Sequence, residues 1–414
     1  MQPLALFVHC FNHSLNLALQ DTMKGLPATR EALKWVHDVG VIVHRSPKRK
    51  HALDQLRATY DEQGGPGPSS ICPTRWTVRV RLITGLLSSY LSVLTFLGDL
   101  AEQNTTEIIE DGKRVNISTE ARGLHDQLKK GSVYFTLLAM RDVFSPCEEL
   151  GKTLQSPSYT VSGAKQAVNL TLQKLKRMRS SDDHFETLWA EMEAATEKYD
   201  LKAPTLPRRR NLPAQNEYNP AHTAAAHQFN AAKDKIRKEF FELLDLAIAE
   251  INSRFDQDDF NKLQMMETAL LTHPNDWGSD SKNIEDLLEN YGFNVRKLKC
   301  NLESLSDIAP GCTTVGEVAG KLTELQPQAR RLFSQLEDLL ILLLVVPVSA
   351  ATAERTFSMM RRLKTYLRST MGHARLNHLA LLTVYKERVD MLDVRRLMQL
   401  FVNNDLRHSI FGAI

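Results

Sequence analysis

A cysteine and a histidine stand three residues apart near the start of the sequence, at Cys10 and His13. If this segment is helical, the spacing places both side chains on one face, where they could converge on one point. A zinc site needs further ligands, and the neighbouring sequence offers no second pair. The alternative is a buried helix in which His13 is satisfied by a hydrogen bond. Taken alone, the pair favours this second interpretation.

An arginine and a tryptophan lie together at Arg75 and Trp76, directly after a loop rich in glycine and proline at residues 63–73. The guanidinium can form a fork with a phosphate. The indole offers a flat surface for an unpaired base, and such stacking is worth ~1–3 kcal/mol per base. The alternative is a helix start in which Thr74 is the N-cap and Trp76 folds into the core. Without other information this structural role is favoured.

A glutamate near the C-terminal end, Glu354, follows Pro347 and the plausible N-cap Ser349. A carboxylate at the start of a buried helix could hold a divalent metal ion. The alternative is compensation of the helix dipole together with an ion pair to the adjacent Arg355. One carboxylate is not a metal site.

The overall composition is that of an ordinary globular protein of two or three structural units. The chain has 414 residues, of which 43% are hydrophobic and 24% charged, and its formal net charge is +3. This charge is too small to indicate nucleic-acid binding by itself, so any DNA contact must come from local patches. The five cysteines are scattered without a C-x-x-C pair, so we expect reduced thiols in the cytosol or nucleus.

No segment is predicted to cross a membrane or to act as a signal peptide. The first residues include no basic stretch, and their apolar run is short. The longest apolar stretch, residues 339–346, is followed by Pro347 and falls far short of the ~20 residues that a spanning helix needs. We interpret it as a buried strand or a buried helix end.

Helical periodicity dominates the sequence, so we predict a mainly α fold. The helical pattern between residues 118 and 199 is predicted to break near Pro146 and Pro157. A linker rich in proline and arginine follows at residues 202–220. After it, residues 224–255 are predicted to form one amphipathic helix, whose apolar side comprises Ile236, Phe240, Leu243, Leu244, Ala247 and Ile251.

Two short apolar runs are the β candidates. Residues 4–9 are rich in strand formers, and residues 340–346 are the second candidate. An apolar strand needs neighbours for its N–H and C=O groups, so a lone strand at the start looks like the remainder of a sheet. We therefore predict a partial sheet built from these two runs, with helices elsewhere.

Taken in order, the three motifs resemble the hAT transposase superfamily. C-x-x-H followed by S-L-N-L comes first, T-R-W follows, and the segment from Ser349 to Ser358 stands near the end. The closing sequence, R-S-T-M and then R-L-N-H-L-A-L-L up to Leu382, is similar to that family's C-terminal dimerisation region. The closest resemblance is to domesticated proteins of the zinc finger MYM-type group and to the repressor of the inhibitor of the interferon-induced protein kinase.

The resemblance implies an RNase H-like core in which two Asp and one Glu hold two divalent metal ions for DNA cleavage. It matches Glu354 to the catalytic Glu. It matches Trp76 to the aromatic residue that stacks on a flipped base, with Arg75 and Arg355 as neighbouring DNA contacts. The C-x-x-H pair would lie beside the active site.

Both Asp positions of that family lie upstream of the C-x-x-H pair, and none of the residues before Cys10 is Asp or Glu. Metal-assisted phosphoryl transfer needs several converging oxygen ligands, which Glu354 alone cannot supply. We therefore expect no metal site and a chain that is non-catalytic as it stands, with Mg²⁺ or Mn²⁺ entering only in a longer product. Two alternatives stay open: part of an active transposase whose Asp-bearing strands are missing, and an unrelated helical scaffold.

The resemblance also implies three regions. Residues 1–85 would be a truncated RNase H-like core, residues 86–335 a helical insertion domain, and residues 336–414 the dimerisation region that completes the core. We expect a homodimer or higher oligomer, DNA as a further partner, no membrane, and a nuclear or cytoplasmic location. The candidate interface residues are Leu376, Leu379, Leu382, Leu397 and Phe401.

Overall fold

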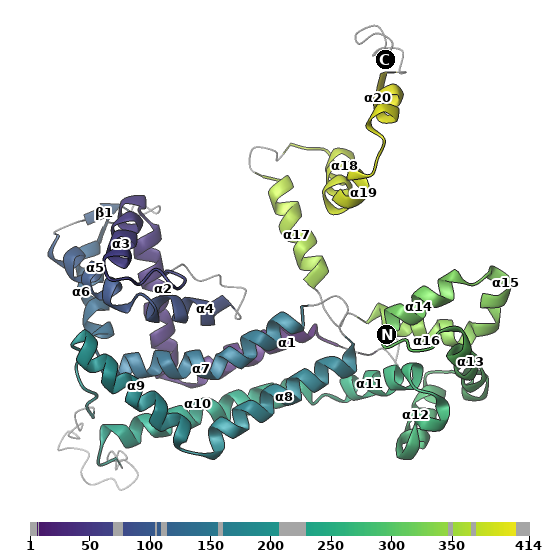
Figure 1. Cartoon of the computed structure of the whole chain (residues 1–414), viewed down its shortest axis with the longest axis horizontal. Helices are drawn as coiled ribbons and strands as arrows, with labels where there is room; N and C mark the ends of the chain where they lie inside the picture. The colour runs from purple at the N-terminus through teal and green to yellow at the C-terminus, as the bar shows by residue number, and fades with distance from the viewer. Residues whose placement is uncertain are drawn as a thin grey trace, which may run out of the picture. The chain divides into compact units, whose positions relative to one another are not determined.

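The computed structural model describes residue 6 and residues 8–68, 78–103, 106–108, 114–155, 160–206, 229–346, 351–365 and 370–402. Helices make up most of this part (Figure 1), as predicted. Contacts divide the chain into two compact units, Met1–Ser349 and Ala350–Ile414. The predicted domain boundaries at residues 85 and 335 stay predictions.

The first unit begins with α1 (Phe11–Gly25), α2 (Pro27–His44) and α3 (Pro47–Thr59). Both α2 and α3 start with proline, which suits a first helical position because the N–H that proline lacks has no partner within the helix there. The apolar residues of α2 recur at helical spacing, and those on one face are buried, including Ala32, Val36, Val39 and Val43.

Two apolar helices and a hairpin follow: α4 (Val78–Leu87), α5 (Tyr90–Glu102), and the strands β1 (Thr106–Ile108) and β2 (Arg114–Asn116). The strands pair antiparallel. Then comes α6 (Ile117–Leu128), in which the Asn116 side chain accepts the N–H of Thr119. Within the described residues no single helix is long and apolar enough to cross a membrane, whereas α4 and α5 together, bent by 78°, meet that test by length and composition only.

Long helices form the centre of the first unit: α7 (Gly131–Thr153), α8 (Val161–Ser180), α9 (Asp183–Tyr199) and α10 (Ala232–Phe255). In Figure 1, α7, α8 and α10 run side by side, and contacts join each pair of them. Rings from three of these helices meet in the core, with centroids 5.4–6.3 Å apart: Phe135, Phe185 and Phe240.

Helix α7 continues through Pro146, so the predicted break there is wrong. Proline within a helix removes one backbone hydrogen bond and normally kinks or ends the helix. Here Pro146 is buried, and α7 contacts α2, α4, α8, α9 and α10. We infer that this packing outweighs the local cost. Pro157 lies outside the described residues.

The start of the unit packs against its later helices. Phe11 of α1 contacts Phe260 of α11 (Asp258–Leu271), with ring centroids 4.6 Å apart. Arg254 Nη2 of α10 lies 2.7 Å from Asp21 Oδ2 of α1. Residues more than two hundred positions apart along the chain therefore belong to one core.

A buried carboxylate of α11 caps another helix. The Glu267 side chain, 2% exposed, accepts the N–H of Val161 at 2.9 Å and that of Ser162 at 2.7 Å. These two N–H groups open α8 and have no partner within that helix. The negative charge also suits the positive end of the helix dipole.

The first unit ends with a group of shorter helices, α12 (Ser281–Asn290), α13 (Val295–Ile308), α14 (Val315–Glu324), α15 (Pro327–Arg330) and α16 (Ser334–Val345). Before α14, Thr314 and Glu317 form a reciprocal capping box. The second unit contains α17 (Ala351–Leu363), α18 (His373–Val384), α19 (Lys386–Asp390) and α20 (Val394–Val402).

The predicted strand at residues 340–346 is wrong, because residues 340–345 belong to α16. Leucine is a good helix former, and the helix buries Leu336, Leu339, Leu340 and Leu343 on one side. Of residues 4–9, Leu6, Val8 and His9 have no regular structure, and the other three lie outside the described residues. Strand pairing within the described ranges is limited to the β1–β2 hairpin and one isolated bridge, so the predicted partial sheet is not among the described elements.

Candidate functional site

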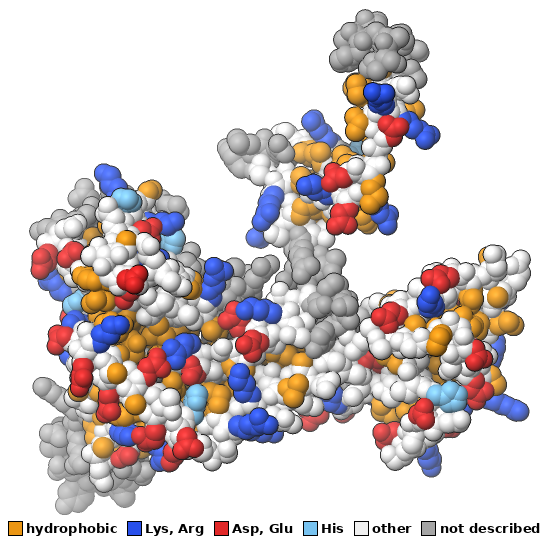
Figure 2. All heavy atoms as spheres, in the orientation of Figure 1, with side chains coloured by type: hydrophobic (Ala, Val, Ile, Leu, Met, Phe, Trp, Pro, Cys, Tyr) orange, Lys and Arg blue, Asp and Glu red, His pale blue; other side chains and the backbone are white. Residues whose placement is uncertain are grey.

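Helices of the second unit leave most of their large apolar side chains in contact with solvent. Among the hydrophobic residues described in this unit, Leu376 and Val402 are buried. Exposed large apolar side chains lie on α17 and along the stretch from α18 to α20. They are Phe357, Leu381, Leu382, Val384, Tyr385, Met391, Leu392, Val394, Leu397, Met398, Leu400 and Phe401. Figure 2 shows such hydrophobic side chains interspersed with basic ones on these helices.

Helix α20 shows the pattern most clearly. Val394, Leu397, Met398 and Phe401 follow one another at the spacing of one helix face, and each is 45–66% exposed. The Asp393 carboxylate accepts hydrogen bonds from the backbone N–H groups of Arg395 and Arg396, which supports the start of the helix. The result is a helix with an apolar face that the described residues of its own unit do not cover.

An exposed apolar stripe also occurs on α16 in the first unit. Ile341, Leu344 and Val345 are exposed and share one side of the helix, whereas the opposite side is buried in the unit. Contiguous exposed apolar surface of this kind commonly marks a surface that binds another protein. We use the name C-terminal apolar surface for two separate groups of exposed apolar residues, those of α16 in the first unit and those of α18–α20 in the second, each described within its own unit.

The helices that bear much of this surface match a known family of protein–protein contact regions. Residues 324–387 match the hAT family C-terminal dimerisation region, a stretch that runs from the last residue of α14 into α19. The match supports a hAT-family transposase-like protein and indicates self-association. No solved structure matches the chain. Helix α20 lies beyond the matched residues and extends the same apolar character.

The candidate interface residues differ in exposure. Leu382, Leu397 and Phe401 are exposed, and Leu379 is half-buried. Leu376 is 7% exposed and packs inside its own unit, so it is available to another chain only if that unit opens.

Of the predicted catalytic and DNA-binding residues, the structure describes only a part. Glu354 and Arg355 lie in the first turns of α17, but their side chains are outside the described part. Arg75 and Trp76 lie wholly outside it. The resemblance implies that the C-x-x-H pair lies beside an active site that includes Glu354 and Trp76. This stays a prediction, since Trp76 is outside the described part and His13 and Glu354 belong to different units.

The C-x-x-H pair lies at the start of α1. Cys10 occupies the N-cap position and is half-buried, whereas His13 is exposed, with its ring centroid 6.0 Å from that of His9. The interpretation of His13 as a buried, internally satisfied residue is therefore wrong. Among the described residues no three His, Cys, Asp or Glu side chains converge in a group that could hold a metal ion.

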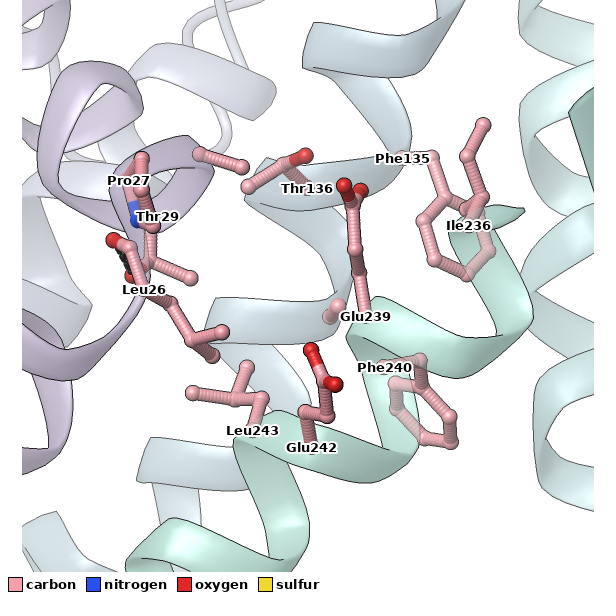
Figure 3. A pocket seen from close by; sticks show the side chains of 12 residues that line it. Leu26, Pro27, Thr29, Phe135, Thr136, Ile236, Glu239, Phe240, Glu242 and Leu243 are labelled. Atoms are coloured by element: carbon pink, nitrogen blue, oxygen red, sulfur yellow. Dashed lines mark hydrogen bonds between the residues drawn. The ribbon is translucent and has the colours of Figure 1, made fainter. Parts of the chain in front are cut away.

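Sequence reasoning missed a second feature, a cavity in the first unit with two glutamates, Glu239 and Glu242, in its lining (Figure 3). Both belong to α10, the helix whose apolar side was predicted correctly. The available signal was their position beside Phe240 and Leu243, at the border of that apolar side. Periodicity alone does not tell that a carboxylate at such a border faces a cavity.

Proposed function

We propose that this chain is the self-associating part of a hAT-transposase-derived protein and that it acts through dimerisation. The observation that carries the proposal is the C-terminal apolar surface, which coincides over α16 and α18 with the matched dimerisation region. Stable homodimers bury roughly 2,000 Å² or more of largely apolar surface. The exposed apolar residues of α16 and of α18, both within the matched residues, fit that requirement.

The proposal also includes the expectation that this chain does not itself cleave DNA. One residue, Glu354, matches an acidic position of the family, and a single carboxylate does not hold the two divalent ions that strand cleavage requires. We infer that this chain contributes association rather than cleavage, with its N-terminal part as the remnant of an RNase H-like core. Purified protein is expected to show no Mg²⁺- or Mn²⁺-dependent cleavage of DNA. Cleavage that disappears in Glu354→Gln would contradict this inference.

DNA binding is the second candidate function, with Arg75, Trp76 and Arg355 as its contacts and the nucleus as its location. The resemblance of T-R-W and of the Glu354-Arg355 pair to the family motifs supports it. We expect the chain to bind single-stranded DNA and the affinity to fall in Trp76→Ala. Fluorescence anisotropy of a labelled oligonucleotide measures the affinity.

The test of self-association uses sedimentation velocity across a concentration series. The full chain is expected to sediment as a dimer or larger species, and Leu397→Asp with Phe401→Asp is expected to shift it towards the monomer. Leu170→Asp is the matched control, because Leu170 is as exposed, at 59%, but lies on α8 in the first unit. A strict monomer in every variant would overturn the proposal, as would dissociation by the control alone.

A further inference from the structure

The first unit contains a cavity of about 150 Å³ between the start of α2, α7 and α10. Its apolar lining comes from all three segments and includes Leu26, Phe135, Ala139, Ile236, Phe240 and Leu243. Apolar cavities of roughly this volume are large enough for a benzene-sized group. The cavity can therefore accept one ring or a short aliphatic chain.

The polar side chains that line the cavity are two glutamates and two threonines. Figure 3 shows the Glu239 and Glu242 carboxylates rising from α10 into the space between α7 and the start of α2. The Thr29 hydroxyl donates its proton to the Leu26 carbonyl at 2.9 Å. The Thr136 hydroxyl donates to the Ser132 carbonyl, also at 2.9 Å. Both hydroxyl oxygens keep lone pairs for a ligand but have no second proton to donate.

Positive charge is missing from the described residues that line the cavity, which include no Lys, Arg or His. Each of the two glutamates also pairs with a lysine one turn earlier on α10, Glu239 with Lys235 at 3.2 Å and Glu242 with Lys238 at 3.4 Å. Both are partly exposed pairs one helical turn apart, a class worth ~0.3–0.5 kcal/mol. Such pairs do not prevent the carboxylates from binding another cation.

We propose that this cavity binds a small organic cation, an ammonium group carried on an apolar body of about one ring. The apolar lining accepts the body, and the two glutamates with the threonine oxygens accept hydrogen bonds from the ammonium. A neutral ligand of the same shape loses the charge-assisted hydrogen bonds. An anion meets two carboxylates and is excluded.

The test compares benzylamine, which is protonated at neutral pH, with its neutral isostere benzyl alcohol, by ligand-detected NMR and calorimetry on the full chain. Benzylamine is expected to bind about tenfold more tightly, because hydrogen bonds to charged groups are stronger than neutral ones. Blocked lysine, Nα-acetyl-lysine methylamide, is the third probe. Tighter binding of blocked lysine than of benzylamine would identify a protein side chain as the source of the ammonium group, and the reverse would identify a free amine.

Substitutions in the cavity lining test whether benzylamine binds in this cavity. Glu239→Gln with Glu242→Gln is expected to reduce benzylamine binding to the level of benzyl alcohol, and Ala28→Leu, at the lining, to exclude both. Glu250→Gln, on the same helix but outside the lining, is the matched control and is expected to bind normally. Circular dichroism and thermal unfolding verify the fold of each variant.

Three results would overturn the proposal. Equal affinity for benzylamine and benzyl alcohol would show a cavity without charge selectivity. Normal benzylamine binding both to the Glu239→Gln, Glu242→Gln double variant and to Ala28→Leu, while both variants unfold normally, would show that the cavity is not an ammonium site. The absence of benzylamine binding to the unmodified chain would show the same.

Discussion

Helices α10 and α20 both carry apolar residues at helical spacing, but within the described residues of its own unit only the apolar face of α10 is covered. In α10 the side chains of Ile236, Phe240 and Leu243 are at most 7% exposed, because α1, α7 and α8 pack against that helix. In α20 the corresponding face, represented by Leu397 and Phe401, is about half exposed. Helical periodicity thus identifies an apolar face, whereas the identity of what covers the face depends on the rest of the chain or on another chain.

The difference has an energetic meaning. Full burial of a leucine or phenylalanine side chain contributes ~1.5–3 kcal/mol relative to exposure. In the first unit this contribution already stabilises the fold. In the second unit much of it is still available, and association with a second copy can use it.

The largest expected effect separates the two regions directly. Phe240→Ala leaves a cavity beside the rings of Phe135 and Phe185 and is expected to lower the free energy of unfolding by ~3–5 kcal/mol. Urea denaturation measures the loss, with Phe241→Ala, a partly buried neighbour on the same helix, as the control. A loss below that of the control would mean that the aromatic cluster does not hold the first unit together.

A smaller effect is expected at the buried carboxylate. Glu267→Ala leaves the N–H groups of Val161 and Ser162 without acceptors and is expected to cost ~2 kcal/mol. Glu267→Gln, which keeps one acceptor oxygen, is expected to fall between this variant and the unmodified chain. Thermal unfolding and amide hydrogen exchange at the start of α8 provide the measurements. Unchanged exchange there would exclude a capping role.

The next effect depends on pH. Burial opposes ionisation of the Asp142 carboxyl, but the His184 ring, whose Nε2 lies 3.3 Å from Asp142 Oδ2, and the hydrogen bond from Arg141 outweigh it, and the pKa of Asp142 is lowered. Because the folded pKa lies below the unfolded one, this stabilisation is present above the unfolded pKa and is lost as pH falls through the folded pKa. Asp142→Asn is expected to weaken the acid dependence of the free energy of unfolding. An identical pH profile in both proteins would show that the group makes no contribution.

The smallest effect is expected at the exposed face. At low protein concentration Phe401→Ala is expected to change the free energy of unfolding by less than ~0.5 kcal/mol, as for other surface changes. At high concentration the effect is expected to grow, since association stabilises only the folded chain. Thermal unfolding across a dilution series measures both limits. A large effect already in the dilute monomer would mean that Phe401 is covered by its own chain.

The comparison also shows how far the sequence can lead. The periodicity of residues 224–255 predicted the buried positions of α10 correctly, and the helix itself begins at Ala232. The motifs predicted the C-terminal region that the family comparison matches. In α10 a strong local pattern agrees with the tertiary structure, and in the C-terminal region the local pattern agrees with the family comparison.

Other features depend on contacts that no local pattern encodes. The run of apolar residues in α16 lacks periodicity, so strand and helix were equally compatible with it, and packing selects the helix. Pro146 predicts a break that the surroundings of α7 override. The role of Glu267 and the lining of the cavity arise between segments far apart along the chain, which is why composition and spacing did not reveal them.

The contact between α1 and α10 also has a consequence for biosynthesis. Asp21 and Arg254, which lie 233 residues apart, form an ion pair across this contact. During translation at ~5–20 residues per second, α1 therefore waits roughly 10–50 s before its partner helix has been made. Throughout that interval α1 can contact α2 and α7, but the side of α1 that packs against α10 lacks this partner, so part of its apolar surface stays exposed in the nascent chain.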